Sequence, residues 1–472
     1  MFLFLSKAVS TQGYSVLNNL GDPSISLMQT NPATSAVNFQ AWSFRLGGAS
    51  FDAGNKYIAF RKQSVFSLIR ERESYLEKID EDISTMSEIP EILNLHTYKG
   101  KKSSANIELE ILGPSFSIQL PTGSLGFFAN AKALGYVKSP NWDGLSEIAD
   151  LSTQIPFTFP KVNVSALHYM EFGINYSIAK EIEHETILSF GANLKYYKGG
   201  ELLFIKSLSE GSAIKQLDSL NLMNSEFEAG LFLNLQHDDE SDQTDYSPKY
   251  FGAGGGIDLG VHYSFPSNLV KNTSIQLGLS ISDLGMMTFK NGDYHLFNVP
   301  DGYTLKDEFL DEFPTNELQK DIEINGAEYI SRDSKITIWA PTTLNILAEL
   351  PISQSLNFGF ASRLNVPHLG PIKRAEFISL IPRYQHKAAH FHFPISLYNF
   401  RFLHVGSGIH FGPIRIGSDN ILPFLVKTNL RSANFYFTLE LTPADLPKFL
   451  RRNSTRGSRN KRSKDKVKCY YF

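Results

Sequence analysis

The chain has 472 residues, of which 42% are hydrophobic and 12% aromatic, and its formal net charge is -3. No stretch approaches the roughly 18 to 20 apolar residues of a membrane-spanning helix, which excludes a helical membrane protein. Alternating strands lower the mean hydropathy of a chain, so its value of -0.17 is still compatible with a membrane β-barrel. The single cysteine, Cys469, excludes a disulfide framework within the chain.

The first ten residues have some features of an export signal. Phe2–Leu5 is apolar, and Ala8 and Ser10 have the small-x-small spacing of a cleavage site, although a charged leader is missing. We interpret residues 1–10 as the remnant of an export signal clipped by a misplaced start codon. An apolar N-terminal strand is the alternative.

Segments with one apolar and one polar face recur along the chain. In "SIQLGLSIS", residues 274–282, isoleucines and leucines alternate with serine, glutamine and glycine, and a side-chain period of two is that of a β-strand. The same alternation occurs at 106–111, 115–120, 170–178, 188–196, 227–236, 257–265, 343–350, 356–364, 406–417 ("GSGIHFGPIRIG") and 434–441. Spread over some 400 residues, these segments leave room for roughly 12 to 16 strands.

Helices that would cover the apolar faces of these strands are scarce. The one clear helical stretch, residues 64–84, is charged and lies within an insert that reaches residue 95. Lipid covers apolar faces if the sheet closes into a barrel with its polar residues inward. We expect these acidic side chains to face the lumen: Glu108, Glu110, Glu171, Glu228, Asp258, Glu349 and Glu440. A soluble β-sandwich is the alternative.

The segments between the strands differ in length, as long external loops and short turns require. Residues 139–161, 236–249 and 290–335 are long, polar and mostly acidic. Acidic loops are usually solvated, and bridging to lipopolysaccharide or ligand through divalent cations is the alternative.

Two motifs carry a family resemblance. Asn31, Pro32 and Ala33 resemble the Asn-Pro-Ala box of FadL-like outer-membrane transporters, and "FGAGGGIDLGVHYSF" (251–265) is similar to a glycine-rich strand of related barrels, including the PorV and PorP types. With "SFRLGGASF" and "VGSGIHFGPIRIGSDNIL", the chain resembles a bacterial outer-membrane barrel family of unassigned function, DUF5723, over residues 14–441. The resemblance implies an all-β fold: a transmembrane antiparallel β-barrel of about 14 strands, with long extracellular loops and an N-terminal plug segment.

Catalytic and cofactor motifs are missing from the sequence. It contains no G-x-S-x-G, P-loop, H-E-x-x-H or C-x-x-C motif, so we predict no enzyme, cofactor or metal site. Glu108 and Glu110 share a strand face at a spacing compatible with acid–base chemistry, but lumen charges are far commoner. His390 and His392, with His386 if the strand continues, would form half of a zinc or copper site, for which no third ligand is evident.

These features divide the chain into an export remnant (1–10), a plug segment (11–40), an outer-membrane β-barrel (41–444) and a basic periplasmic tail (445–472). The tail has ten Lys and Arg against two Asp. It would bind a periplasmic or cell-wall partner, or be a solvated, disordered tail; a nucleic-acid partner is not expected.

The family resemblance implies a bacterial outer-membrane channel or transporter for small hydrophobic or amphipathic molecules, in contact with outer-membrane lipid and lipopolysaccharide. The alternative is a structural anchor of a surface secretion or gliding apparatus.

Overall fold

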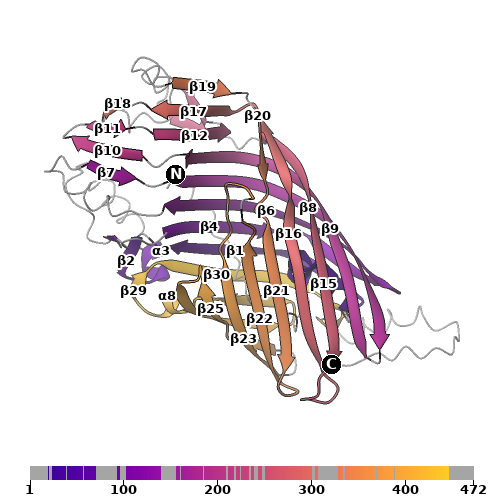
Figure 1. Ribbon diagram of the computed structural model, residues 1–472. Coiled ribbons are helices and arrows are strands. Elements are labelled where there is room, and N and C mark those ends of the chain that lie inside the picture. Colours follow the sequence, from indigo (N-terminus) through magenta and orange to yellow (C-terminus); the bar gives the residue numbers. More distant parts are fainter. Residues whose placement is uncertain are drawn as a thin grey trace.

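The structure is a computed structural model of the chain (Figure 1). It describes residues 20, 24–38, 40–56, 58–70, 93–95, 103–139, 156–159, 161–183, 185–208, 211–216, 219–223, 225–232, 235–238, 243–246, 250–299, 303–306, 328–332, 335–367, 369–386 and 389–445.

The main sheet closes on itself. Strand β1 (Trp42–Asn55) pairs in antiparallel register with the last strand, β30 (Ser432–Leu441), from Phe44 opposite Leu441 to Gly54 opposite Ser432. The resulting ring has 14 strands, and some of these are interrupted, so that two or three shorter strands follow one another along the same line. This confirms the prediction of an all-β antiparallel barrel of about 14 strands. The alternative, a two-sheet sandwich, is wrong.

The other ring strands follow in chain order. They are β4 (Ser103–Leu112), β5 (Ser115–Leu120), β6 (Gly123–Ser139), β8 (Asn163–Glu183), β9 (Thr186–Ser207), β12 (Ser225–Phe232), β15 (Gly252–Pro266), β16 (Ser274–Lys290), β17 (Asp293–Val299), β19 (Glu328–Arg332), β20 (Lys335–Trp339), β21 (Thr343–Pro351), β22 (Leu356–Asn365), β23 (Phe377–His386), β24 (Ala389–His392), β25 (Ile395–Tyr398), β26 (Phe402–Val405), β27 (Ser407–Phe411) and β28 (Ile414–Ser418).

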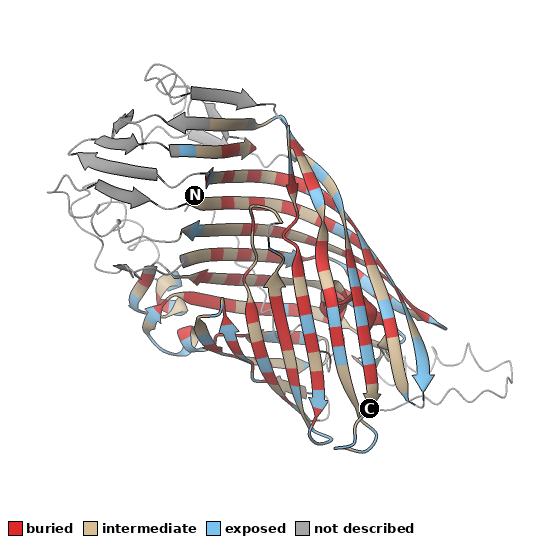
Figure 2. Ribbon diagram, in the orientation of Figure 1, coloured by how far each residue is buried: buried red, intermediate tan, exposed pale blue. Residues whose placement is uncertain are grey.

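Buried and exposed residues alternate along these strands (Figure 2). On β8, Phe172, Ile174 and Tyr176 are exposed, whereas Glu171 and Asn175 are buried. Because the period of two sends successive side chains to opposite faces, the ring has an apolar outer surface and a largely polar interior, here called the lumen. A soluble protein has the reverse arrangement.

The two ends of the ring differ in their connections. One end, here the short-turn end, has the short connections 121–122, 184–185, 267–273, 352–355, 387–388 and 412–413. The opposite end, here the loop end, has the longer connections 56–102, 140–162, 208–224, 300–327, 366–376 and 419–431.

Short strands form three further small sheets. They are β7 (Pro156–Phe159), β10 (Gly211–Gln216), β11 (Ser219–Met223) and β18 (Tyr303–Lys306) in one, β13 (Leu235–Asp238) and β14 (Gln243–Tyr246) in another, and β2 (Ile58–Gln63), β3 (Leu93–Leu95) and β29 (Thr428–Leu430) in the third.

Three expected elements differ in the structure. The segment 406–417 is two strands, β27 and β28, because Gly412 has a φ of +55° and turns the chain before Pro413. The segment 227–236 is likewise divided between β12 and β13. In the charged insert, helix α3 covers only Val65–Arg70 of the predicted helix 64–84, residues 71–92 lie outside the described residues, and residues 93–95 form strand β3.

The remaining helices are short. They are α2 (Ile25–Thr30), the 3-10 helix η2 (Pro32–Val37), α8 (Leu422–Leu425) and the 3-10 helix η3 (Pro443–Asp445). Within the described part of the chain, no helix has both the length and the apolar character needed to cross a membrane.

Candidate functional site

Six of the seven carboxylates expected to face the lumen are buried, and only Glu228 is not. Glu108 and Glu110 lie on β4, Glu171 on β8, Asp258 on β15 and Glu349 on β21, and none is more than 4% exposed. A buried carboxylate is costly unless a cation or hydrogen-bond donors compensate its charge. Their partners therefore define the chemistry of the lumen.

Two lysines and two arginines neutralise most of these carboxylates. Lys132 Nζ lies 2.9 Å from Glu171 and 3.7 Å from Glu110, while Lys195 Nζ lies 2.9 Å from Asp258 and 2.7 Å from Asp283. Glu108 pairs with both Arg363 and Arg374. We call this set the central charge cluster; its members are Glu108, Glu110, Lys132, Glu171, Lys195, Asp258, Asp283, Arg363 and Arg374.

Asp283 connects this cluster and does not follow the strand alternation. Period two places Asp283 on the outer face with Ile281, but its φ of +58° turns it inward directly after the buried Ser282. On the neighbouring strand the register shifts between Ile257 and Leu259, and Asp258 accepts a 2.6 Å hydrogen bond from the Asp283 N–H. This is a β-bulge, a feature that re-aims one side chain.

The other acidic residues have separate partners. Arg383 donates to Glu349 at 2.7 Å, and Arg415 to Glu440 at 2.9 Å. Glu228 is only half-buried, near the loop end, where Tyr294 donates to it.

An N-terminal segment, residues 24–37, lies inside the ring. It consists of α2, Asn31 and η2, and most of its residues are buried. Asn31 holds the two helices together, because its side-chain oxygen accepts from Ala33 N at 3.1 Å as the N-cap of η2. Its amide nitrogen donates to the Val261 carbonyl of β15 at 3.1 Å. Pro32 occupies the first position of η2, where the missing N–H is harmless.

Small polar side chains of the wall bind the main chain of this segment. Ser280 and Ser282 donate to the Thr30 carbonyl at 2.6 and 3.1 Å, and Asn193 donates to Met28 O at 3.2 Å. The polar face of "SIQLGLSIS" thus meets protein rather than bulk water. Gly260 of the wall lets the N-terminal segment approach the β15 backbone closely, since a Cβ at this position would lie 2.1 Å from Asn31 Oδ1.

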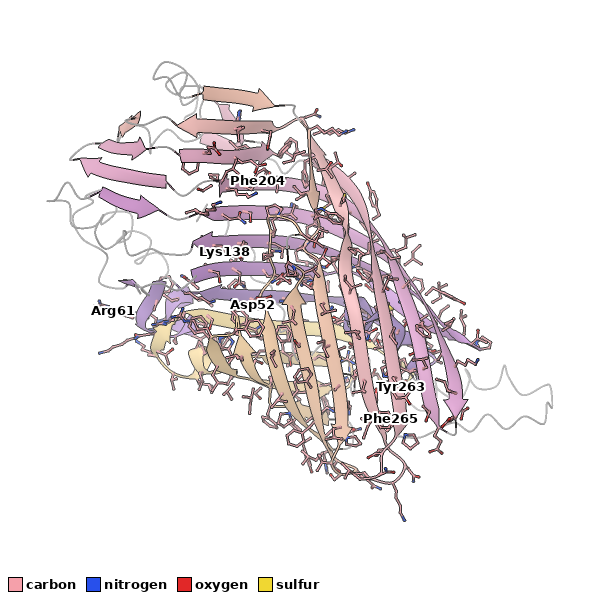
Figure 3. The ribbon with its side chains drawn as sticks, in the orientation of Figure 1. Asp52, Arg61, Lys138, Phe204, Tyr263 and Phe265 are labelled. Atoms are coloured by element: carbon pink, nitrogen blue, oxygen red, sulfur yellow. The ribbon has the colours of Figure 1, made fainter. Side chains whose placement is uncertain are left out.

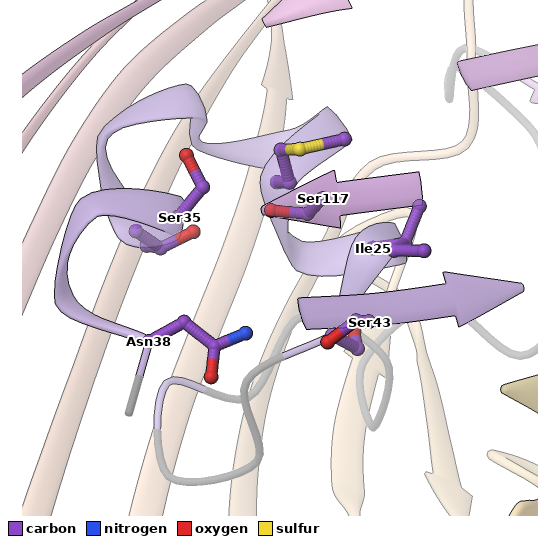
Figure 4. A pocket seen from close by; sticks show the side chains of 8 residues that line it. Ile25, Ser35, Asn38, Ser43 and Ser117 are labelled. Carbon is purple, nitrogen blue, oxygen red and sulfur yellow. The ribbon is translucent and has the colours of Figure 1, made fainter. Parts of the chain in front are cut away.

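A small cavity remains between the N-terminal segment and the wall (Figure 4). It has room for about one water molecule, which excludes it as a substrate site. Ile25, Ser35 and Asn38 face Ser43 of β1 and Ser117 of β5 across it.

From the loop end, the connection between β22 and β23, residues 366–376, turns into the lumen; we call it the β22–β23 loop. Asn163 of β8 donates to Pro371 O at 2.8 Å. Arg374 reaches the central charge cluster, where it pairs with Glu108 and lies 3.6 Å from Asp283. Gly370 has a φ of +68°, and a Cβ there would lie 2.9 Å from Trp339 O.

A lysine of the β22–β23 loop makes hydrogen bonds within the loop. Lys373 Nζ donates to the carbonyls of Val366 and Leu369 at 3.0 and 3.1 Å. Partial burial lowers the pKa of Lys373, and the charge of Lys138 lowers it further.

An apolar cluster surrounds the tip of the β22–β23 loop. Ile372 is 1% exposed and packs in this cluster, whose members come from the inner face near the loop end. They include Leu134, Leu167, Leu202, Phe204, Phe232, Met287, Phe289 and Ile338. From the loop end inward, the lumen therefore contains an apolar layer, a charged layer and the N-terminal segment.

A continuous chain of polar contacts joins the two inserted segments. Arg374 contacts Asp283, Asp283 contacts Lys195, and Lys195 contacts Asp258. Asn193 then donates both to Asp258 at 2.8 Å and to Met28 O. Of these five side chains, only Asp258 is among the acidic residues that the strand alternation predicts to face the lumen.

The histidines do not gather into a metal site. His390 contacts His410 at 5.0 Å between ring centroids, and His392 is buried, whereas His386 stacks on Tyr384. Among the described residues, no group of three or more His, Cys, Asp or Glu is arranged to hold a metal ion.

The two ends of the chain carry predictions that lie outside the described residues. These are the export remnant (1–10), the first part of the plug segment and the basic tail after Asp445.

Comparisons with known proteins give a family and distant structural similarities. The profile of a family described as "Family of unknown function (DUF5723)" matches residues 32–419. No curated protein matches the chain.

Three of the solved structures that are similar to the chain are as follows. The Ralstonia pickettii toluene transporter TbuX is 8% identical, with coverage of 92% of this chain and 98% of that chain and a TM-score of 0.31. The deltaS2 mutant of the TodX monoaromatic hydrocarbon channel is 9% identical, with 91% and 94% coverage and a TM-score of 0.29. A Pseudomonas aeruginosa FadL homologue is 10% identical, with 92% and 98% coverage and a TM-score of 0.27. Such low TM-scores give no information on what this chain binds.

Proposed function

The chain belongs to the DUF5723 family of unknown function, and we propose that it is a bacterial outer-membrane β-barrel that moves small hydrophobic or amphipathic molecules through its lumen. The match of the family profile over residues 32–419 confirms the family resemblance of the sequence.

The outer surface supports placement in a membrane. Large apolar side chains are exposed on strands all around the ring, including Ile111, Ile174, Leu194, Leu279, Phe358, Leu380, Leu403 and Phe437. A monomeric soluble protein rarely exposes so continuous an apolar surface, because its hydration is unfavourable. Hydrocarbon chains of lipid would cover it without cost.

Aromatic residues near the short-turn end support the same placement. Tyr263 and Phe265 of β15 lie side by side with ring centroids 5.4 Å apart, close to the turn at 267–273 (Figure 3). Barrels that span membranes have girdles of such residues at the interfaces between hydrocarbon and water.

The observation that carries the transport proposal is that two separate segments enter the lumen and are held in it without covalent bonds. The N-terminal segment is bound mainly through hydrogen bonds from short wall side chains, and the β22–β23 loop through Arg374 and Ile372. A barrel that serves only as an anchor has no need of two removable closures. A barrel that admits a substrate does.

The apolar cluster suggests how entry begins. A hydrophobic molecule arriving at the loop end would replace Ile372 among side chains such as Phe204 and Phe289, because it offers equivalent apolar contact. Movement of the β22–β23 loop would withdraw Arg374 from Glu108 and Asp283. Lys195 and Asp258 would then rearrange next to Asn193, the residue that holds Met28 O of the N-terminal segment.

Entry of N-phenyl-1-naphthylamine into intact cells tests this proposal, because the dye fluoresces on reaching the inner leaflet and an intact outer leaflet slows it. Cells with the wild-type chain should take up the dye faster than cells without it, and Phe204→Asp, which places a charge in the apolar layer, should abolish the difference. Lys271→Asp, in a turn at the short-turn end, is the control. Equal uptake with and without the chain would contradict the proposal.

The anchor alternative depends on residues 445–472, of which only Asp445 is described. It stays a prediction, together with the periplasmic or cell-wall partner of the tail.

A further inference from the structure

Two short helices at the loop end form an exposed apolar patch. Phe66 and Ile69 of α3 are 64% and 55% exposed, and Leu425 of α8 is 70% exposed. The helices contact each other through Phe66 and Phe424, whose ring centroids are 5.9 Å apart. We call this surface the α3–α8 patch.

Basic residues border the patch. Arg61 and Lys62 precede α3 and Lys427 follows α8, and all three are exposed. Residues 58–70 and 421–431, which build the patch, contain no Asp or Glu. An apolar surface whose described border is basic matches an amphipathic partner whose head group is anionic.

The patch continues the apolar outer surface of the ring. Ile421 N, directly before α8, donates to the Val405 carbonyl of β26 at 2.9 Å, and β26 exposes Leu403 and Val405 outward. Arg61 lies at the opposite end of the molecule from Tyr263 and Phe265 (Figure 3). The patch therefore lies at the loop end of the ring, at the edge of the apolar outer surface that lipid would cover.

From this continuity and charge, we infer that the α3–α8 patch binds a phosphorylated glycolipid of the outer leaflet, with its acyl chains on Phe66, Ile69 and Leu425 and its phosphates on Arg61, Lys62 and Lys427. The inference rests on the membrane placement proposed above. Arginine and lysine are the usual partners of phosphate, because charge-assisted hydrogen bonds are stronger than neutral ones.

The test is binding of bisphosphorylated lipid A to the purified full chain in detergent micelles, with dephosphorylated lipid A as the matched ligand. Each variant is first compared boiled and unboiled on a gel to establish that the barrel is closed. Wild type should bind the phosphorylated form at least tenfold more tightly than the dephosphorylated form. The triple variant Arg61→Glu/Lys62→Glu/Lys427→Glu should lose that preference.

Matched controls lie at the short-turn end. Lys180→Glu/Lys271→Glu changes two exposed lysines there and should leave binding within twofold of wild type. Leu425→Ser should weaken both lipids alike, whereas Leu269→Ser, at a similarly exposed turn leucine, should weaken neither.

Equal binding of the two lipids to wild type, or undiminished preference in the triple variant, would overturn the inference. If the triple variant does not fold, Lys427→Gln replaces it and should still reduce the preference. Dye entry into cells is a separate readout, so failure of transport and failure of lipid binding are distinguishable.

Discussion

Lys195 Nζ lies 2.7 Å from Asp283 Oδ1 in the middle of the lumen, and this pair stands between the two segments that enter it. On one side Asp283 contacts Arg374 of the β22–β23 loop, and on the other Lys195 contacts Asp258, which shares Asn193 with the N-terminal segment. The charges are paired and buried, so removing any one of them leaves its partners less well compensated.

Arg374→Ala should open the loop end. A buried charge left without a partner costs about 3 to 5 kcal/mol, and the cost here is smaller, because Glu108 keeps Arg363 and Asp283 keeps Lys195. Because the loop is a local element, we expect that cost to release the loop before the ring unfolds. Added protease should cleave residues 366–376 faster in the purified variant than in wild type.

A lysine-to-alanine change in the same loop provides the comparison. Among the described residues, Lys373 donates to carbonyls of the loop itself, so Lys373→Ala should increase cleavage much less than Arg374→Ala. Equal cleavage of the two variants would mean that the contact of Arg374 with the cluster does not hold the loop.

Two leucines with nearly equal exposure test whether lipid covers the ring. Leu194 is 68% exposed on β9, and Leu269 is 66% exposed in the turn at 267–273. In a membrane, Leu194→Arg should lower the free energy of unfolding by about 2 to 4 kcal/mol, the cost of a cation on the lipid face near the bilayer midplane. Leu269→Arg should change it by no more than about 1 kcal/mol, since the turn lies near the interface.

Urea unfolding in lipid vesicles measures both variants. In water, exposed substitutions of either kind would stay within about 0.5 kcal/mol. If Leu194→Arg and Leu269→Arg both change the free energy of unfolding in vesicles by such small amounts, the membrane placement is contradicted.

The sequence predicts the ring well because the alternation of side chains is local. Ser280, Ser282 and the carboxylates Glu108, Glu171 and Asp258 are buried on the face that the period of two assigns to them. Asp283 does not follow this alternation, since its position depends on a β-bulge with a positive φ, which the local sequence pattern does not predict.

The position of Arg374 in the lumen is not predicted by the sequence for another reason. It lies in a connection rather than a strand, and its place in the lumen depends on the fold of residues 366–376 against β4, β8 and β16. A positively charged residue in a loop is normally solvated, so the sequence offers no signal for a buried ion pair. The sequence indicates only a turn at Gly370 in "HLGPIKRAE", since glycine before proline marks a turn.

Gly370→Ala should loosen the β22–β23 loop through backbone strain. An L-residue at a φ of +68° costs about 1 kcal/mol, and the new Cβ would also lie 2.9 Å from Trp339 O. Dye entry into cells should therefore be faster than in wild type. Gly412→Ala imposes similar strain at a φ of +55°, but its nearest neighbour is 3.8 Å away in a turn at the short-turn end, so it should leave dye entry unchanged. Faster entry in both variants would indicate general loosening of the ring.

Gly260→Ala should displace the N-terminal segment from the wall. The added Cβ would lie 2.1 Å from Asn31 Oδ1 and 2.8 Å from Pro32 Cδ, closer than real Cβ contacts allow. The Asn31 side chain would have to leave both Ala33 N and Val261 O, and a lost cap alone costs about 1 kcal/mol. Gly255→Ala on the same strand is the control, because its nearest atom is 3.4 Å away. In planar bilayers, Gly260→Ala should show frequent open-channel events and Gly255→Ala should resemble wild type. If both are as quiet as wild type while still closed as barrels, the N-terminal segment does not gate the lumen.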